Sequence, residues 1–153
     1  SRSGVKVDLI VRGICCILPG VTGYTDNVRV MSVVGRYLEH PRIFSFGNGN
    51  DQKIYIGSAD MMTRNTEKRV EVAAPILDQD IRRQINHYLK VMLSDNVKAR
   101  VLGSDGKYRR KEQKEPYIDS QNVFMQEALQ AKPPQEVPEK IGLLKRIGRI
   151  FSR

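Results

Sequence analysis

Two short β-rich runs separated by a polar connector constrain the fold of this chain most. The runs cover residues 43–46 and 53–56, and the connector 47–52 is rich in glycine and asparagine, so the pattern predicts a β-hairpin. Before the first run, His40 and Arg42 stand two residues apart and would share one face of an extended backbone. After the second run come Gly57 and Ser58, whose N–H groups and hydroxyl we expect to be free to approach an anion. The hairpin therefore predicts a phosphate-binding site.

Length and charge set the broad class of the protein. The 153 residues suffice for one compact domain, and 26 lysines and arginines against 17 acidic residues give a net charge of +9. Such an excess predicts a polyanionic partner: nucleic acid, nucleotide, polyphosphate or an anionic membrane surface. The sequence holds no apolar run of transmembrane length and no signal-peptide pattern, which leads us to expect a cytoplasmic protein. Because Ser1 leads almost directly into a strand pattern, we expect a segment cut from a longer protein.

The two cysteines, Cys15 and Cys16, are adjacent within an apolar run. Neighbouring cysteines rarely bridge each other and this spacing fits no metal motif, so we expect two buried free thiols.

The first third of the chain predicts one strand and one helix. Residues 5–11 alternate and then turn apolar, which indicates a strand that delivers Arg12 to its carboxyl end, where anions are often bound. A helix is expected from Asp26 or Asn27 to about Glu39, with an apolar face at helical spacing. Pro41 would end it at His40 and so place this histidine at a helix-to-strand junction. A histidine there can bind a ligand or merely cap the helix dipole.

The middle third predicts a strand and a second helix. Residues 60–68 read as irregular, with a short helical turn near Met61 and Met62. Residues 69–75 alternate as a strand that puts Arg69 and Glu71 on one face, either as a solvated pair or with Arg69 facing the site. An amphipathic helix then starts at Asp78 or Gln79, and His87 beside its apolar stripe is expected to be structural or exposed. The stripe is formed by Ile81, Ile85, Tyr88, Leu89 and Met92.

The last third becomes basic and irregular. Residues 97–102 predict the last strand, at a sheet edge, and residues 103–114 a turn followed by a solvated basic run. A short helix is expected at 121–131, a proline-rich linker at 132–138 and a basic amphipathic helix at 139–153. That tail could lie on a membrane, dock on a partner or pack on the intact protein. We therefore divide the chain into a domain at 1–102 and a linker with a tail at 103–153.

Four ordered motifs resemble the C-terminal catalytic domain of bacterial polyphosphate kinases, over about residues 5–100. They are Val-Asp-Leu-Ile-Val-Arg-Gly-Ile-Cys-Cys, Tyr-Leu-Glu-His-Pro-Arg-Ile-Phe, Tyr-Ile-Gly-Ser-Ala-Asp-Met-Met-Thr-Arg-Asn and Arg-Val-Glu-Val-Ala-Ala-Pro-Ile-Leu-Asp. The resemblance implies a phospholipase-D-like α/β fold, a mixed sheet flanked by helices, in which two similar domains face each other across a tunnel.

The resemblance also implies a chemistry. This family transfers the terminal phosphate of ATP to polyphosphate, reversibly and with Mg²⁺, through a phosphohistidine in a preceding domain that this chain lacks. By motif match, Arg12 and His40 would contact ATP and Arg69 would line the tunnel, with Arg42 and Ser58 as further candidates. We expect no metal ligand in this chain, because Mg²⁺ would be bound mainly by ATP and the missing domain. The implied partners are ATP or ADP, polyphosphate and the remaining domains of the polypeptide, with a homo-oligomer possible.

Two other functions stay open. A hydrolytic phospholipase D motif has a lysine two residues after its histidine and an aspartate five residues after that lysine, whereas here these positions are Arg42 and Gly47. The substitutions argue for a phosphate-binding half-site over a single-motif phosphodiesterase or nuclease that acts as a dimer. A basic polyanion-binding module driven by charge and by the tail is the third reading.

Overall fold

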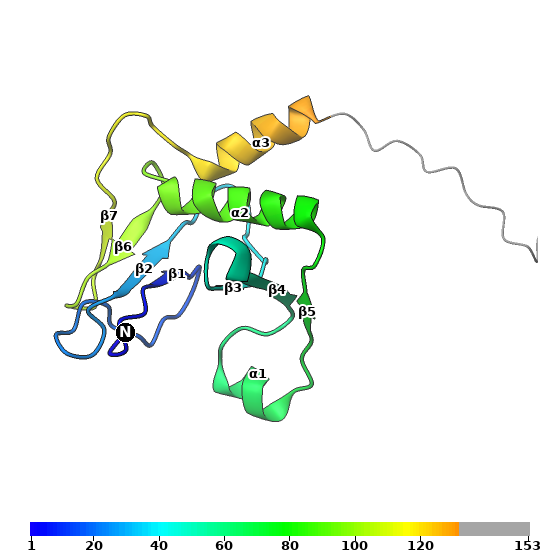
Figure 1. Ribbon diagram of the computed structural model, residues 1–153. Coiled ribbons are helices and arrows are strands. Elements are labelled where there is room, and N and C mark those ends of the chain that lie inside the picture. Colours follow the sequence, from blue (N-terminus) through cyan, green and yellow to red (C-terminus); the bar gives the residue numbers. More distant parts are fainter. Residues whose placement is uncertain (132–153) are drawn as a thin grey trace, which may run out of the picture.

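The computed structural model describes residues 1–131, which form a mixed α/β domain with two sheets and flanking helices (Figure 1). The α/β class expected from the sequence is confirmed. The predictions for residues 132–153, a linker and an amphipathic tail, lie outside the described residues. Within the described part, no helix is long and apolar enough to cross a membrane.

The first sheet contains the predicted N-terminal strand. Its order is β1 (Val7–Ile10), β2 (Val28–Ser32), β6 (Arg100–Leu102) and β7 (Tyr108–Arg110), with β1 and β2 parallel and the other pairs antiparallel. Met31, Val33 and Ala99 form a buried cluster on it, against which Ile10 and Leu93 pack.

The second sheet is built on the hairpin, which confirms that prediction. Strands β3 (Ile43–Phe46) and β4 (Lys53–Gly57) pair antiparallel, and a 3-10 turn, Gly49–Asp51, lies in their connection. Strand β5 (Ala73–Pro75) adds to the free edge of β4. The predicted strand at 69–75 is thus shorter than expected, and residues 69–72 remain extended outside the sheet.

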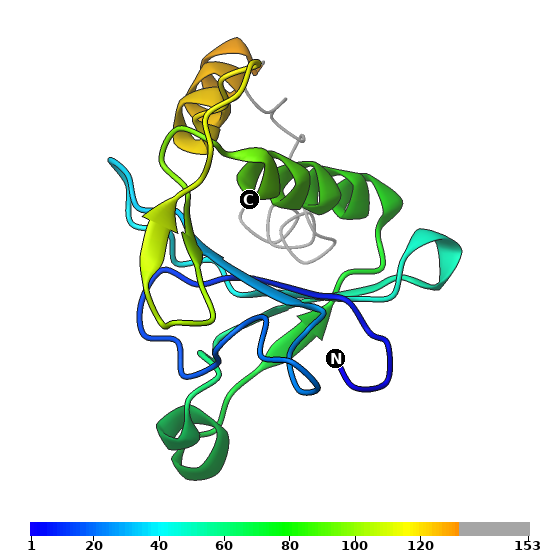
Figure 2. The ribbon, with the colours of Figure 1, turned by 90° about the vertical axis from the view of Figure 1, so that its left-hand side faces the viewer.

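The three helices are α1 (Thr63–Lys68), α2 (Gln79–Ser94) and α3 (Ser120–Gln130). The helices predicted from Asp78 or Gln79 and at 121–131 are confirmed as α2 and α3. Asp78 caps α2 by accepting from the N–H groups of Asp80 and Ile81 at 2.8 and 3.0 Å. Helix α2 lies over one side of the molecule in both views, with α3 beside it and α1 at the opposite end (Figures 1 and 2). The Tyr88 and Phe124 rings pack edge to face, 5.2 Å apart, between α2 and α3.

His87 also lies between these two helices. Its Nε2 is 2.7 Å from Oε1 of Glu127 on α3, and its side chain is half exposed. The prediction that His87 is structural or exposed agrees with this position.

Asp95 joins α2, β6 and α3. Its side chain is fully buried: Oδ1 accepts from the N–H groups of Val97, Lys98 and Ala99, and Oδ2 from the N–H and hydroxyl of Ser120. These five hydrogen bonds fix where α3 begins relative to the first sheet.

The predicted helix from residue 26 to about 39 is wrong. Residues 28–32 form β2, which pairs in parallel with β1 through four residue pairs and buries Val30 and Met31. Valine is a poor helix former and suits a half-buried strand, and pairing with a distant strand outweighs the helical spacing of the apolar residues. His40 therefore lies in an irregular connector, not at the end of a helix.

The sequence pattern indicates that the strand at 97–102 is the last one and lies at a sheet edge. In the structure, β6 is neither the last strand nor at an edge. The chain turns at 103–107, where the Gly103 N–H donates to the Lys107 carbonyl at 3.0 Å, and returns as β7. Asp105 holds the turn through Arg109, and this contact lowers the pKa of Asp105 to about 2. Because β7 consists of Tyr-Arg-Arg, its charged residues make it difficult to recognise as a strand from the sequence.

Two smaller expectations also change. Cys15 and Cys16 are free, but Cys16 is exposed and Cys15 only partly buried, so they are not buried thiols. The helical turn expected near Met61 and Met62 lies later in the chain: α1 begins at Thr63 and Met62 is its N-cap.

Candidate functional site

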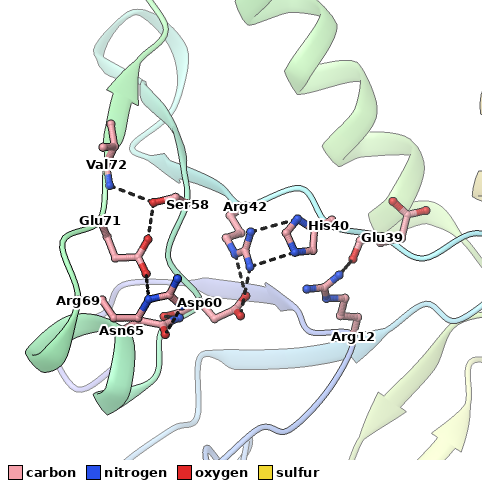
Figure 3. A network of polar contacts seen from close by, with 10 residues as sticks. All are labelled: Arg12, Glu39, His40, Arg42, Ser58, Asp60, Asn65, Arg69, Glu71 and Val72. Atoms are coloured by element: carbon pink, nitrogen blue, oxygen red, sulfur yellow. Dashed lines mark hydrogen bonds and ion pairs between the residues drawn. The ribbon is translucent and has the colours of Figure 1, made fainter.

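The candidate residues meet where three irregular segments come together. The connector between β2 and β3 carries His40 and Arg42, the end of β4 carries Ser58, and the segment before β5 carries Arg69 (Figure 3). Arg12 follows β1 and reaches the same place from the first sheet. All five residues that the sequence singled out thus lie in or beside one polar network.

Arg42 and Asp60 form the centre of this network. Nε and Nη2 of Arg42 lie 2.9 and 3.3 Å from the two carboxylate oxygens of Asp60, so the contact is bidentate. The Arg42 side chain is only 16% exposed. Hydrogen bonding from Arg42, with smaller contributions from the charges of Arg12 and His40, lowers the pKa of Asp60. The pKa of Arg42 is raised, mainly by its hydrogen bond to Asp60.

His40 lies against the same guanidinium. Nη1 and Nη2 of Arg42 are 3.2 and 3.3 Å from the two ring nitrogens of His40 (Figure 3). Because Asp60 holds Arg42 through Nε and Nη2, the guanidinium that contacts the imidazole is itself held by two hydrogen bonds. The expectation that His40 and Arg42 share a face agrees with this contact.

Arg12 is anchored differently. Its Nη1 donates to the main-chain carbonyl of Glu39, the residue before His40. Among residues 1–131 this is its one hydrogen bond, and no carboxylate lies within ion-pair distance of it. Most of the donor fork of Arg12 can therefore bind an anion.

Ser58 is engaged in holding the second sheet to the segment before β5. Its hydroxyl accepts from the Val72 N–H at 3.0 Å and donates to the Glu71 carboxylate. The N–H groups of Gly57 and Ser58 donate to the carbonyls of Arg42 and Val72 at 2.9 and 3.0 Å. The expectation that these N–H groups are free for an anion is wrong, because the hairpin and its neighbour segment use them.

Arg69 is an exposed candidate. Its side chain is 63% exposed, with Nη1 3.4 Å from Oδ1 of Asn65 and Nε 3.5 Å from Oε1 of Glu71. The predicted pairing of Arg69 and Glu71 is present, and the Glu71 side chain is the more buried of the two. Oε1 of Glu71 is buried and accepts no hydrogen bond, so the pair with Arg69 is loose.

Asp60 and Asn65 are site residues that the sequence reasoning missed. Asn65 is 2% exposed, and its amide donates to the Asp60 carbonyl at 3.1 Å while its oxygen faces Arg69. The hairpin register held the signal for Asp60: pairing of Ile43 with Ile56 places Arg42 beside Gly57, within reach of an acidic side chain three residues on.

The arginines of the network are unevenly paired. Arg42 and Arg69 pair with the carboxylates of Asp60 and Glu71, whereas the carboxylate of Glu39 accepts from Gln121 and not from Arg12. Arg42 is matched by Asp60, whereas Arg12 has no carboxylate partner in the described part and Arg69 shares Glu71 at the limit of an ion pair. The site can therefore bind an anion whose oxygens face two forked donors, as phosphate oxygens do.

Metal-binding capacity is low in the part of the chain that the structure describes. No group of three or more His, Cys, Asp or Glu side chains lies together there. Asp60 and Glu71 are already occupied by Arg42 and by Ser58 with Arg69, so the residues present do not fit a divalent cation.

Comparison with known proteins gives consistent matches. The family model for "Polyphosphate kinase C-terminal domain 2" matches residues 1–121. The chain is 48% identical over 132 residues to the polyphosphate kinase of Prosthecochloris aestuarii, covering 86% of this chain and 18% of that protein. It is 43% identical over 143 residues to polyphosphate kinase 1 of Chlorobaculum tepidum, covering 94% and 20%.

A solved structure is also similar. The crystal structure of polyphosphate kinase from Porphyromonas gingivalis superposes with a TM-score of 0.78 at 38% sequence identity, covering 84% of this chain and 20% of that one. The chain therefore spans about a fifth of the length of the relatives it matches.

Proposed function

The chain belongs to the polyphosphate kinase C-terminal domain 2 family, and from this we propose that it forms one wall of a site that transfers the terminal phosphate of ATP to inorganic polyphosphate and back. The observation that carries the proposal is the polar network that brings Arg12, His40, Arg42 and Arg69 together while leaving Arg12 without a carboxylate partner among the described residues. The activity proposed is that of the full-length protein, of which this chain is a part.

Arg12 and Arg69 are the proposed phosphate ligands. Phosphoryl transfer needs charge neutralised on the non-bridging oxygens, and a guanidinium stays protonated throughout while presenting a planar fork of donors. Both side chains keep N–H groups that no described residue satisfies. Arg42 acts differently, because the Asp60 carboxylate already balances its charge. Arg42 orients His40 and neutralises less of the negative charge of the ligand.

His40 is the proposed proton carrier. An imidazole can both donate and accept a proton, so it can give a proton to a leaving phosphate and take one back in the reverse direction. The nucleophile that forms the phosphohistidine is proposed to lie in the preceding domain. This chain alone is therefore expected to be inactive, and conversion of ADP to ATP from polyphosphate by the isolated chain would contradict that expectation.

Mg²⁺ is proposed to enter with the nucleotide. Its chemistry would be to neutralise charge on the phosphate chain. Since Asp60 and Glu71 already pair with arginine or serine side chains, we derive no step of the reaction through a metal held by this chain.

The test compares two histidine variants of the full-length enzyme. His40→Gln removes the proton carrier, and His87→Gln is the matched control because His87 lies between α2 and α3. We expect His40→Gln to lower kcat on the order of 100-fold and to change the pH profile near neutrality, because general acid–base catalysis has that magnitude. His87→Gln should behave as wild type. Normal turnover and an unchanged pH profile in His40→Gln would contradict the role.

The other functions considered from the sequence have their own outcomes. Hydrolysis of a phosphodiester by the isolated chain would support the phosphodiesterase, although Arg42 is committed to Asp60 and cannot act as the missing lysine does. Polyanion binding that survives loss of Arg12 and falls steeply with salt would support the basic module.

A further inference from the structure

The connector that carries His40 has almost no backbone support of its own. Residues 33–42 contain no helix or strand, and from Gly35 to Pro41 no backbone group bonds to another backbone group among the described residues. A loop without such bonds needs side chains to select one conformation. Two side chains from elsewhere in the chain do so: Arg12, through the Glu39 carbonyl, and Gln121.

Gln121, which lies on α3, makes three hydrogen bonds to the connector. Its Oε1 accepts from the Tyr37 N–H at 3.0 Å, and its Nε2 donates to the Tyr37 carbonyl at 2.8 Å and to the Glu39 carboxylate at 2.9 Å. One donor and two acceptors face the amide, so a single orientation of the side chain satisfies all three. Gln121 is 5% exposed, and the bonds are therefore shielded from water.

The contact is also fitted in shape. A Cβ on Gly35 would lie 2.9 Å from Cδ of Gln121 and closer still to its Oε1, so a side chain at that position would force the Gln121 amide to move. Ser120, the neighbour of Gln121, is fixed by buried Asp95, which sets the position of α3. The amide is thus held by the domain and in turn holds the connector.

We propose that Gln121 is a positioning residue for the candidate site: it sets the conformation of residues 35–39 and thereby the places of His40 and of the Glu39 carbonyl that anchors Arg12. The hydrogen bonds of the Gln121 side chain go to Tyr37 and Glu39, so it acts on His40 and Arg12 through the connector and not by direct hydrogen bonds to them. The inference rests on the proposed function, because it assigns a role to Gln121 in that same site.

The test uses the full-length enzyme with Gln121→Met and Gln121→Glu. Methionine keeps the length and removes all three hydrogen bonds, whereas glutamate keeps the shape, removes the donor and adds a charge beside Glu39. Gln126→Met is the control, since Gln126 is exposed on the same helix and undergoes the same chemical change. Melting temperatures are measured for every variant, and kcat and KM for ATP are measured with polyphosphate as acceptor.

We expect both Gln121 variants to lower kcat/KM for ATP by about tenfold, with Gln126→Met as wild type. The decisive step repeats Gln121→Met in a background that carries both Arg12→Ala and His40→Gln, because the proposal has Gln121 act through both residues. If Gln121 acts through the connector, its loss should cost little more once both are gone, because effects within one network are not additive. A purely structural effect would instead lower activity by the same factor in both backgrounds.

The outcomes separate this inference from the proposed function. Wild-type kinetics in both Gln121 variants, equal losses in the two backgrounds, or failure of both variants to fold would each overturn the positioning role. Unchanged ATP kinetics in Arg12→Ala itself would instead contradict the proposed function.

Discussion

Replacing Asp95 by asparagine tests how the domain sets the position of α3. The carboxylate is fully buried and accepts five hydrogen bonds. Asparagine can keep the three bonds at Oδ1, but its NH₂ group would face the N–H of Ser120, and the two bonds at Oδ2 would be lost. Hydrogen bonds to a charged group contribute about 1.5 to 3 kcal/mol each, and the Ser120 hydroxyl can turn to recover about 1 kcal/mol. We expect the free energy of unfolding to fall by about 2 to 5 kcal/mol.

The pH dependence of this effect has a definite sign. Burial raises the pKa of Asp95, but hydrogen bonds from Ser120, Lys98 and Ala99 outweigh it, so the pKa is lowered overall. A group whose pKa is lowered by folding stabilises the fold above its unfolded pKa, about 3.9 for aspartate, and loses that contribution as the pH falls through its folded pKa. The difference between wild type and Asp95→Asn should therefore be full near neutrality and shrink in acid.

Urea unfolding of the chain, followed by circular dichroism near pH 7 and again below about pH 4, measures both effects. Asp8→Asn is the control, because Asp8 makes an exposed ion pair with Arg29 and should shift the midpoint little. An unchanged midpoint in Asp95→Asn, or a difference that grows in acid, would refute the reasoning.

Two further predictions concern the site and its support. Arg42→Lys in the full-length enzyme should lower kcat/KM for ATP on the order of tenfold, because an ammonium cannot contact both oxygens of Asp60 and also lie along the His40 ring. Steady-state kinetics measure this loss beside the control Arg83→Lys, and equal kcat/KM values for the two variants would refute the prediction. Gly57→Ala should lower the free energy of unfolding by about 1 to 3 kcal/mol, because a Cβ would lie 3.1 Å from the Phe44 ring and 3.3 Å from the Val72 carbonyl. An unchanged urea midpoint would show that Phe44 and Val72 move aside without a loss of stability and would refute the prediction.

The sequence predicted best those elements that local patterns specify. The hairpin at 43–56 is bounded by its own glycines, and α2 has a cap at Asp78 and an apolar stripe, so neither depends on a distant partner. The prediction for residues 28–32 was wrong because their apolar spacing also fits a helix, and only their pairing with β1 favours a strand. Strand β7 was missed because its residues are charged and its partner is β6.

The candidate site follows the same division. Arg12, His40, Arg42, Ser58 and Arg69 were found from chemistry-bearing residues near strand ends and from the motif resemblance. Asp60, Asn65 and Gln121 were not, because each acts through a contact that the fold creates: Asp60 across the hairpin, Asn65 from the buried side of α1, and Gln121 from a helix more than eighty residues after Tyr37. Residues that act by orienting other residues are difficult to identify from a single sequence.

The most direct test of the proposed site is a titration of the 153-residue chain with ATP and with polyphosphate at two salt concentrations. It compares wild type, the double variant Arg12→Ala with Arg69→Ala, and a chain ending at Gln130. We expect the arginine pair to abolish binding while the truncation leaves it, since the proposed phosphate ligands Arg12 and Arg69 are both kept in the shorter chain. Binding that is lost on truncation and unaffected by the arginine pair would contradict the proposal and leave the basic tail as the polyanion-binding element.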